Sequence, residues 1–117
     1  MTVHEFEIKQ AYSRLSNALT DAHRITEELI KAKAAVTAAT GEALLDGRID
    51  GKNEAAREAQ ARRLFPDEYK QWDLTEMWVR DIRLWVEVQK LEVEEVRTRL
   101  RLAELTAQIA QAEAATE

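Results

Sequence analysis

The clearest pattern in this sequence is a heptad repeat of apolar residues in its first third. From Ile8 to Ala43, eleven positions spaced alternately three and four residues apart are all apolar. This spacing places one continuous apolar seam along a helix, as in helices that pack lengthwise against another helix. The positions are Ile8, Ala11, Leu15, Ala18, Ala22, Ile25, Leu29, Ala32, Val36, Ala39 and Ala43. The pattern predicts a long helix over residues 2–45, and its alanines predict a partner helix at close distance.

A polar segment at residues 46–53 interrupts the helical pattern. Gly47 suits the left-handed residue that ends a helix, and Asp50-Gly51 is a turn pair. Asn53 is a good N-cap for a short helix over residues 54–64. Because this short helix is polar and rich in alanine, it has little apolar area and is expected to dock on the long helices.

A second long helix is predicted over residues 67–114, with Pro66 at its start. Its seam is apolar except at Gln89 and comprises Ile82, Val86, Gln89, Val93, Val96, Leu100, Ala103, Ala107, Ala110 and Ala114. The alternation of apolar residues over 82–88 is also compatible with a strand, but no turn signals flank it, which favours a helix. Antiparallel pairing is expected to place the late alanines, at 103–114, against residues 8–22.

The second long helix carries another apolar stripe outside its seam. The stripe comprises Leu84, Val88, Leu91, Leu102, Leu105 and Ile109. An antiparallel hairpin buries one stripe on each helix, and the short helix is too small and too polar to cover the second. The sequence therefore predicts an all-α, coiled-coil-like antiparallel hairpin with a short connecting helix. We expect one domain over residues 1–117 that oligomerises into a helical bundle, most simply a dimer, through this stripe.

Composition narrows the class of protein. The 117 residues are 45% hydrophobic and 33% charged, which is too apolar for general disorder. The formal charge of −5 argues against a generally basic nucleic-acid binder, and the lack of cysteine excludes disulfides and thiolate sites. Neither a signal peptide nor a membrane span is expected, which favours a cytoplasmic protein without membrane partners.

Candidate catalytic and metal-ligating residues do not converge. Asp46 could begin a calcium loop, but the third position of that loop would be Arg48 and the twelfth Arg57. His4 and His23, the only histidines, lie far apart in the sequence. No nucleophile–base pair is evident, and the Glu-x-x-His pairs of metal-dependent helical bundles are missing. We expect no catalytic residue, no metal and no cofactor.

Aromatic and basic residues gather between residues 52 and 85. Two interpretations stay open: aromatic residues packed in the hairpin or a subunit interface, which is favoured, or a surface that stacks single-stranded bases. The candidate partner or nucleic-acid contacts are Lys52, Arg57, Arg62, Arg63, Trp72, Trp78, Arg80, Arg83 and Trp85.

Residues 49–60 read Ile-Asp-Gly-Lys-Asn-Glu-Ala-Ala-Arg-Glu-Ala-Gln. This stretch resembles a turn in small helical proteins encoded by bacteriophages and prophages, in which Gly-Lys-Asn precedes a helix of the form x-x-x-Arg-x-x-Gln. The resemblance implies a phage origin and the cytoplasm of a bacterial host, and it brings no established activity. The turn itself is expected to need Gly51 for backbone freedom and Asn53 as a cap. Lys52 and Arg57 are not required by the turn, although Arg57 could also bond carbonyls at the end of the first helix.

The resulting functional hypothesis is a non-enzymatic, phage-type accessory protein that acts through helix–helix oligomerisation and protein–protein contact. The alternative is a module that binds single-stranded DNA in phage replication or recombination.

Overall fold

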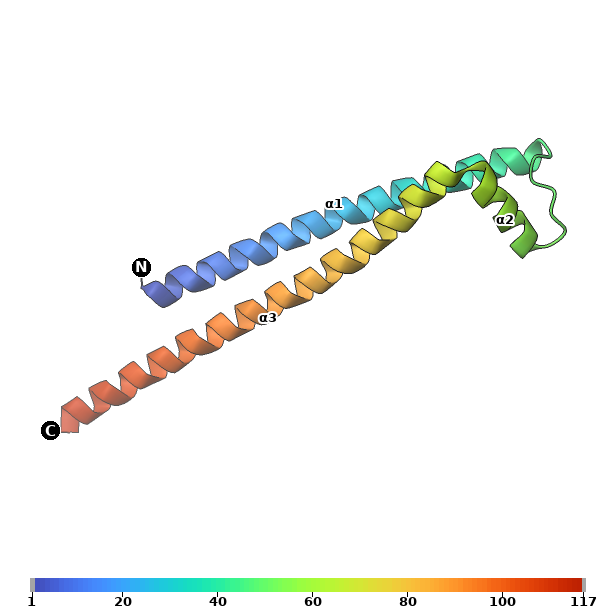
Figure 1. Ribbon diagram of the computed structural model, residues 1–117. Coiled ribbons are helices and arrows are strands. Elements are labelled where there is room, and N and C mark those ends of the chain that lie inside the picture. The colour runs from blue at the N-terminus through green and yellow to red at the C-terminus, as the bar shows by residue number, and fades with distance from the viewer. Residues whose placement is uncertain (1, 117) are drawn as a thin grey trace. The chain divides into compact units, whose positions relative to one another are not determined.

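The computed structural model describes residues 2–116, which form three helices and no strand (Figure 1). Helix α1 spans Val3–Leu45, α2 spans Glu54–Leu64 and α3 spans Pro66–Thr116. The predicted all-α class and the order of the three helices are confirmed. Residues 82–88 lie within α3, so the strand interpretation of their alternation is excluded. Proline occupies the first position of α3, one residue before the predicted start, because a first-turn residue needs no backbone N–H.

The heptad seam of α1 is confirmed along its whole length. All eleven positions are buried or half-buried, and Ala11, Ala18 and Ala43 are almost fully enclosed. The burial of these small side chains shows that the seam packs against other parts of the chain.

The chain forms two compact units, each containing part of α1 and part of α3. Unit 2 comprises Ala22–Ile82 and includes the loop and α2. Its core cluster joins α1 to α3 through α2: the buried members are Val36, Ala43, Ile49, Ala61 and Tyr69, with Phe65 and Trp72 packed against them. The short helix therefore docks on both long helices through Ala61, its one buried side chain, as its polar composition requires.

The loop of unit 2 ends α1 as predicted. Gly47 has a φ of 83°, the left-handed conformation that glycine adopts without a steric penalty. The backbone N–H of Ile49 donates to the carbonyl of Ala43 at 3.1 Å, which brings Ile49 into the core. Asn53 caps α2 by accepting a hydrogen bond from the backbone N–H of Ala56 at 2.8 Å.

Unit 1 comprises the described residues up to Asp21 and those from Arg83 onward. Its core joins Ala11 of α1 to Val93 and Val96 of α3.

Two ion pairs fix the direction of the helices in unit 1. Arg14 pairs with Glu92, and Glu7 pairs with Arg99 at 3.9 Å. A step of seven residues toward the N-terminus of α1 thus matches a step of seven toward the C-terminus of α3, and the two helices are antiparallel.

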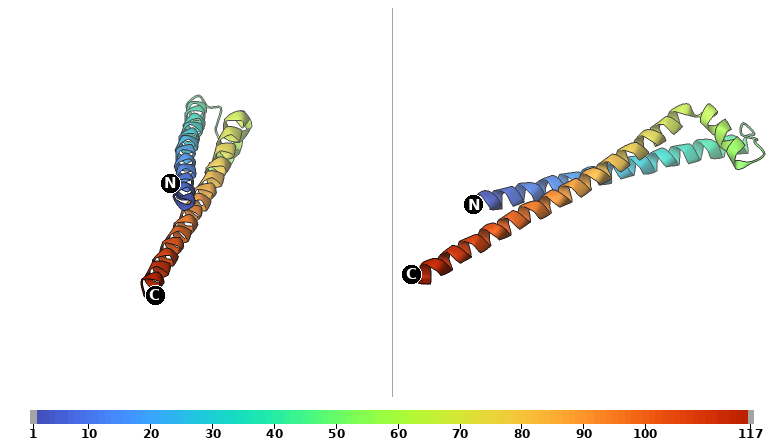
Figure 2. Two further views of the ribbon diagram at one scale, coloured as in Figure 1. Left: turned by 90° about the vertical axis from the view of Figure 1, so that its left-hand side faces the viewer. Right: turned by 60° about the horizontal axis from the view of Figure 1, so that its bottom comes forward.

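The expected pairing of the late alanines with residues 8–22 is wrong. In the register of these ion pairs, α1 begins opposite Ala103, so the later turns of α3 have no α1 residue to contact (Figure 2). Ala107, Ala110 and Ala114 are accordingly exposed, as is every described residue after Ala103. The periodic seam of α3 is longer than the part of it that unit 1 buries.

Candidate functional site

The predicted second stripe of α3 is the largest set of exposed apolar side chains in unit 1. Its members are between 42% and 68% exposed. We call this set the outer stripe; it comprises Leu84, Val88, Leu91, Leu102, Leu105 and Ile109. It follows the same three- and four-residue spacing as the buried seam, and it is interrupted in its middle by Glu95 and Thr98.

The position of the outer stripe on the helix explains its exposure. Leu84 follows the seam residue Ile82 by two positions, and Val88 follows Val86 in the same way. Two residues turn through about 200° around an α-helix, so the stripe faces away from the side that packs on α1. A chain that uses the seam of α3 for its own core cannot use the outer stripe for the same purpose.

Some of the aromatic residues of unit 2 pack in its core, and others lie on its surface. The rings of Tyr69 and Trp72 stack with centroids 5.9 Å apart, and the indole N–H of Trp72 donates to a carboxylate oxygen of Glu76 at 3.1 Å. Trp72 is half-buried against the core cluster, which agrees with the packing interpretation for this residue. Trp78 lies on the surface at 44% exposure, beside the buried Val79.

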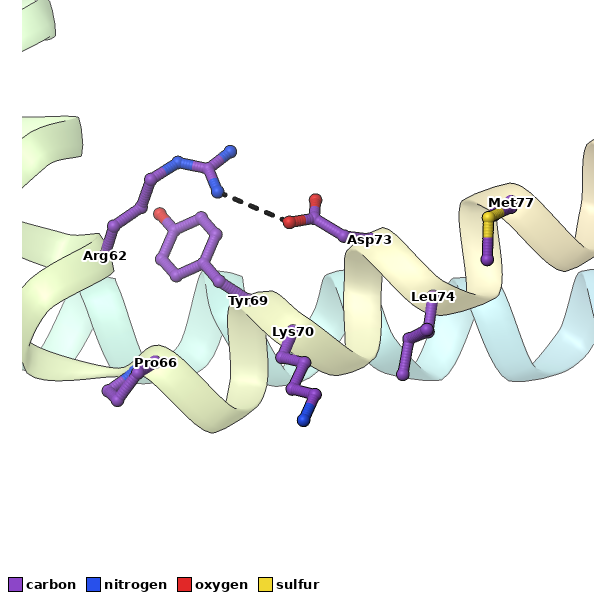
Figure 3. A pocket seen from close by; sticks show the side chains of 7 residues that line it. All are labelled: Arg62, Pro66, Tyr69, Lys70, Asp73, Leu74 and Met77. Atoms are coloured by element: carbon purple, nitrogen blue, oxygen red, sulfur yellow. Dashed lines mark ion pairs between the residues drawn. The ribbon is translucent and has the colours of Figure 1, made fainter.

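Arg62 is already engaged by neighbouring groups (Figure 3). Its guanidinium lies over the ring of Tyr69, 4.6 Å from the centroid, and pairs with Asp73 at 3.5 Å and with Glu58 at 3.3 Å. It borders a shallow hollow of about 460 Å³ that is lined by Arg62, Pro66, Tyr69, Lys70, Asp73, Leu74 and Met77. A phosphate group that approached Arg62 would compete with two carboxylates, so this hollow is a poor anion site.

The residues of the phage-like turn hold its backbone in place. The side-chain oxygen of Gln60 accepts hydrogen bonds from the backbone N–H groups of Asp50 at 3.1 Å and Gly51 at 2.8 Å. Its amide nitrogen donates to the carboxylate of Asp50 at 2.7 Å. Arg57 donates through Nε to the carbonyl of Gly51 at 3.0 Å, so it has a structural partner in the turn rather than at the end of α1.

The prediction that the turn needs Gly51 for backbone freedom is wrong. Among the described glycines only Gly47 has a positive φ, so Gly51 does not need unusual backbone freedom. A Cβ at Gly51 would instead lie 2.9 Å from the backbone nitrogen of Arg57 and 2.9 Å from the Cβ of Ala56. The glycine is required because α2 passes close to the turn. Lys52 is exposed, and its side chain makes none of the contacts that hold the turn.

The remaining candidate residues lie on the surface of their units. Arg63 and Arg80 are exposed in unit 2, and Arg83 and Trp85 are exposed in unit 1. Sequence reasoning did not assign a role to Gln60, although the x-x-x-Arg-x-x-Gln pattern contains it. Its role depends on how the loop folds back on α2, and the spacing of residues does not reveal that contact.

Because of Tyr69, the stability of unit 2 is expected to decrease at alkaline pH. Burial raises the pKa of its hydroxyl above the ordinary value of 10.0, Glu58 raises this pKa further, and Arg62 lowers it. Because the folded-state pKa exceeds the unfolded one, the contribution of neutral Tyr69 is complete below pH 10.0 and is lost as pH rises through the folded pKa. We expect the urea midpoint of unfolding to fall more steeply above pH 10.0 in the wild type than in Tyr69→Phe. Tyr12→Phe, at an exposed tyrosine, is the matched control, and equal alkaline slopes for wild type and Tyr69→Phe would contradict the expectation.

Acidic groups of the loop are also engaged. Asp46 accepts from the Nε of Arg48 at 2.8 Å.

Within residues 2–116, no three side chains from His, Cys, Asp and Glu come together in a way that could hold a metal ion. None of the helices formed by these residues combines the length and hydropathy needed to cross a lipid bilayer.

The chain matches no known protein family, and comparison with curated proteins and with solved structures finds no match.

Proposed function

We propose that this chain is a non-enzymatic accessory protein, of the phage type that its turn resembles, which acts by helix–helix oligomerisation and protein–protein contact through the outer stripe of α3. The observation that carries the proposal is the exposure of six large apolar side chains on one helix face. Exposed apolar faces of this kind are typical of interaction sites, because burying them between partners removes apolar area from water.

The proposal is tested by the mass of the protein in solution. We expect sedimentation and light scattering at micromolar concentration to give an oligomer for the wild type. Leu91→Glu should weaken association on the order of a hundredfold or more, since each copy loses a buried leucine and must desolvate a carboxylate. Leu19→Glu changes a leucine that is 49% exposed on α1 and lies outside the stripe, so it should leave the mass unchanged. A monomeric wild type would refute the proposal, provided that circular dichroism shows the helices intact.

Nucleic-acid binding is the second candidate, and the 44% exposure of the Trp78 side chain, which leaves an aromatic ring accessible to a stacked base, favours it. The engagement of Arg57 and Arg62 within unit 2 weighs against it. The two candidates differ in their response to single-stranded oligonucleotides. A salt-dependent quench of tryptophan fluorescence that is lost in Trp78→Ala would support nucleic-acid binding, and no quench at low salt would exclude it.

A further inference from the structure

The polar residues within the outer stripe restrict what can cover it. Three apolar residues precede the interruption at Glu95 and Thr98, and three follow it. The stripe is therefore nearly symmetric about its polar centre. A second copy of the same stripe, laid in the opposite direction, would match apolar residues with apolar residues and the polar centre with itself.

We propose that the outer stripe binds the outer stripe of a second copy of this chain in antiparallel orientation, with Leu91 of each copy opposite Leu102 of the other. This inference rests on the proposed function and adds the partner, the direction and the register. In this register Glu95 of each copy lies opposite Thr98 of the other. The Thr98 hydroxyl donates to the backbone carbonyl of Glu94 at 2.9 Å within its own helix, and it would have to turn from this carbonyl to donate to the carboxylate of the second copy. The outer apolar layers pair Leu84 with Ile109 and Val88 with Leu105.

The charges that border the stripe are complementary in this register. In antiparallel helices, residues on the same edge of the two stripes meet across the interface. Glu94 of each copy then lies beside Arg101 of the other on one edge, which makes two symmetric ion pairs, and both residues are exposed within the chain. On the other edge, Glu92 lies beside Arg99 of the second copy, although these two side chains already pair with α1 in unit 1.

A surface hollow lies at the same place. It has a volume of about 420 Å³ and is lined by Glu94, Arg97, Thr98 and Arg101. The hollow is thus at the polar centre of the stripe, where the long side chain of Arg101 from a second copy must fit beside Glu94.

Other arrangements of two stripes bring like charges together. A parallel pair in register places Glu95 opposite Glu95 inside an apolar interface, and Glu87 of each copy beside Glu92 of the other. It also sets Glu94 of each copy beside Arg99 of the other, but Arg99 already pairs with Glu7 of its own chain. Sliding the antiparallel pair by seven residues in one direction sets Glu94 against Glu94, and in the other direction Arg101 against Arg101. Like charges that meet across an interface disfavour these arrangements.

Engineered disulfides test the direction and the register, because the chain has no cysteine of its own. We expect the double variant Leu91→Cys/Leu102→Cys to form covalent dimers under mild oxidation. Either single variant alone should give at least about tenfold less dimer, because its two cysteines would lie about 16 Å apart along the helix axes, beyond the reach of a disulfide. Efficient cross-linking of a single variant would overturn the antiparallel register.

Exchange of charges provides a second, independent test. Glu94→Arg and Arg101→Glu should each weaken self-association by about tenfold or more, since each creates two like-charge contacts. The double variant Glu94→Arg/Arg101→Glu restores opposite charges and should associate within about threefold of the wild type. A double variant as weak as the single ones would contradict the proposed pairing.

Sedimentation of the wild type distinguishes a failure of the proposed function from a failure of the antiparallel register alone. A monomer that does not associate would refute the proposed function and this inference together. An oligomer that Leu91→Glu disrupts, but that cross-links through single cysteines, would leave the proposed function standing and refute the antiparallel register alone.

Discussion

Replacing Ala43 with leucine should destabilise unit 2 by about 1–3 kcal/mol or more, because the added methylene groups have no space to occupy. Ala43 is 0% exposed, and its carbonyl accepts the hydrogen bond that brings Ile49 into the core. Its cluster also contains Val36, Ala61 and Tyr69. A leucine at this position must push away either α2 or the start of α3, and both contribute buried residues to the cluster.

Urea unfolding followed by circular dichroism, at one fixed protein concentration, measures this change in the free energy of unfolding. The fixed concentration matters because association would otherwise shift the midpoint. Ala38→Leu is the matched control: it makes the same substitution on the exposed side of α1 and should change stability by no more than about 0.5 kcal/mol. Equal midpoints for the two variants would show that close helix approach does not explain the alanine at position 43.

Sequence reasoning predicted the elements of this fold because their signals are local. The spacing of apolar residues identifies the buried face of α1, since that face depends only on helical periodicity. Gly47 and Asn53 mark the helix ends because each acts on backbone groups a few residues away. The short helix α2 has the same first and last residues as predicted.

The register between α1 and α3 could not be predicted in the same way. A heptad seam looks the same after a shift of seven residues, so periodicity alone does not decide which turn meets which. In unit 1 the ion pair of Arg14 with Glu92 marks the register, and it joins residues that are 78 positions apart in the sequence. For this reason the alanines after position 103 were wrongly expected to contact α1.

The candidate site, like the fold, has features that the sequence predicts and features that it does not. The outer stripe was predicted from periodicity, and its exposure follows from the face that the seam occupies. The roles of Arg57 and Gln60 in the turn, and the stacking of Arg62 on Tyr69, depend on the path of the loop and on the angle at which α2 leaves it. Neither path nor angle is encoded in residue spacing, so these cations looked available in the sequence although they have partners in the structure.

Replacing Gln89 with leucine should stabilise unit 1 by about 1–3 kcal/mol, because it removes a buried polar group that lacks a partner. Gln89 is the one polar residue of the predicted α3 seam and is 2% exposed, yet its side-chain oxygen accepts no hydrogen bond from any described residue. Thr75, equally buried in unit 2, differs in this respect, because its hydroxyl donates to the carbonyl of Gln71 at 2.8 Å.

The same urea experiment measures this effect, with Gln10→Leu as the matched control at an exposed glutamine of α1. Gln10→Leu should leave the midpoint almost unchanged, whereas Gln89→Leu should raise it. A midpoint for Gln89→Leu at or below that of the wild type would contradict the prediction, and it would mean that the amide makes a hydrogen bond to a buried water that leucine cannot replace. A polar residue in a seam also restricts the register of the helices at a cost in stability. We therefore expect the more stable Gln89→Leu variant to have a less uniquely defined pairing of α1 with α3, visible as broadened or doubled amide resonances.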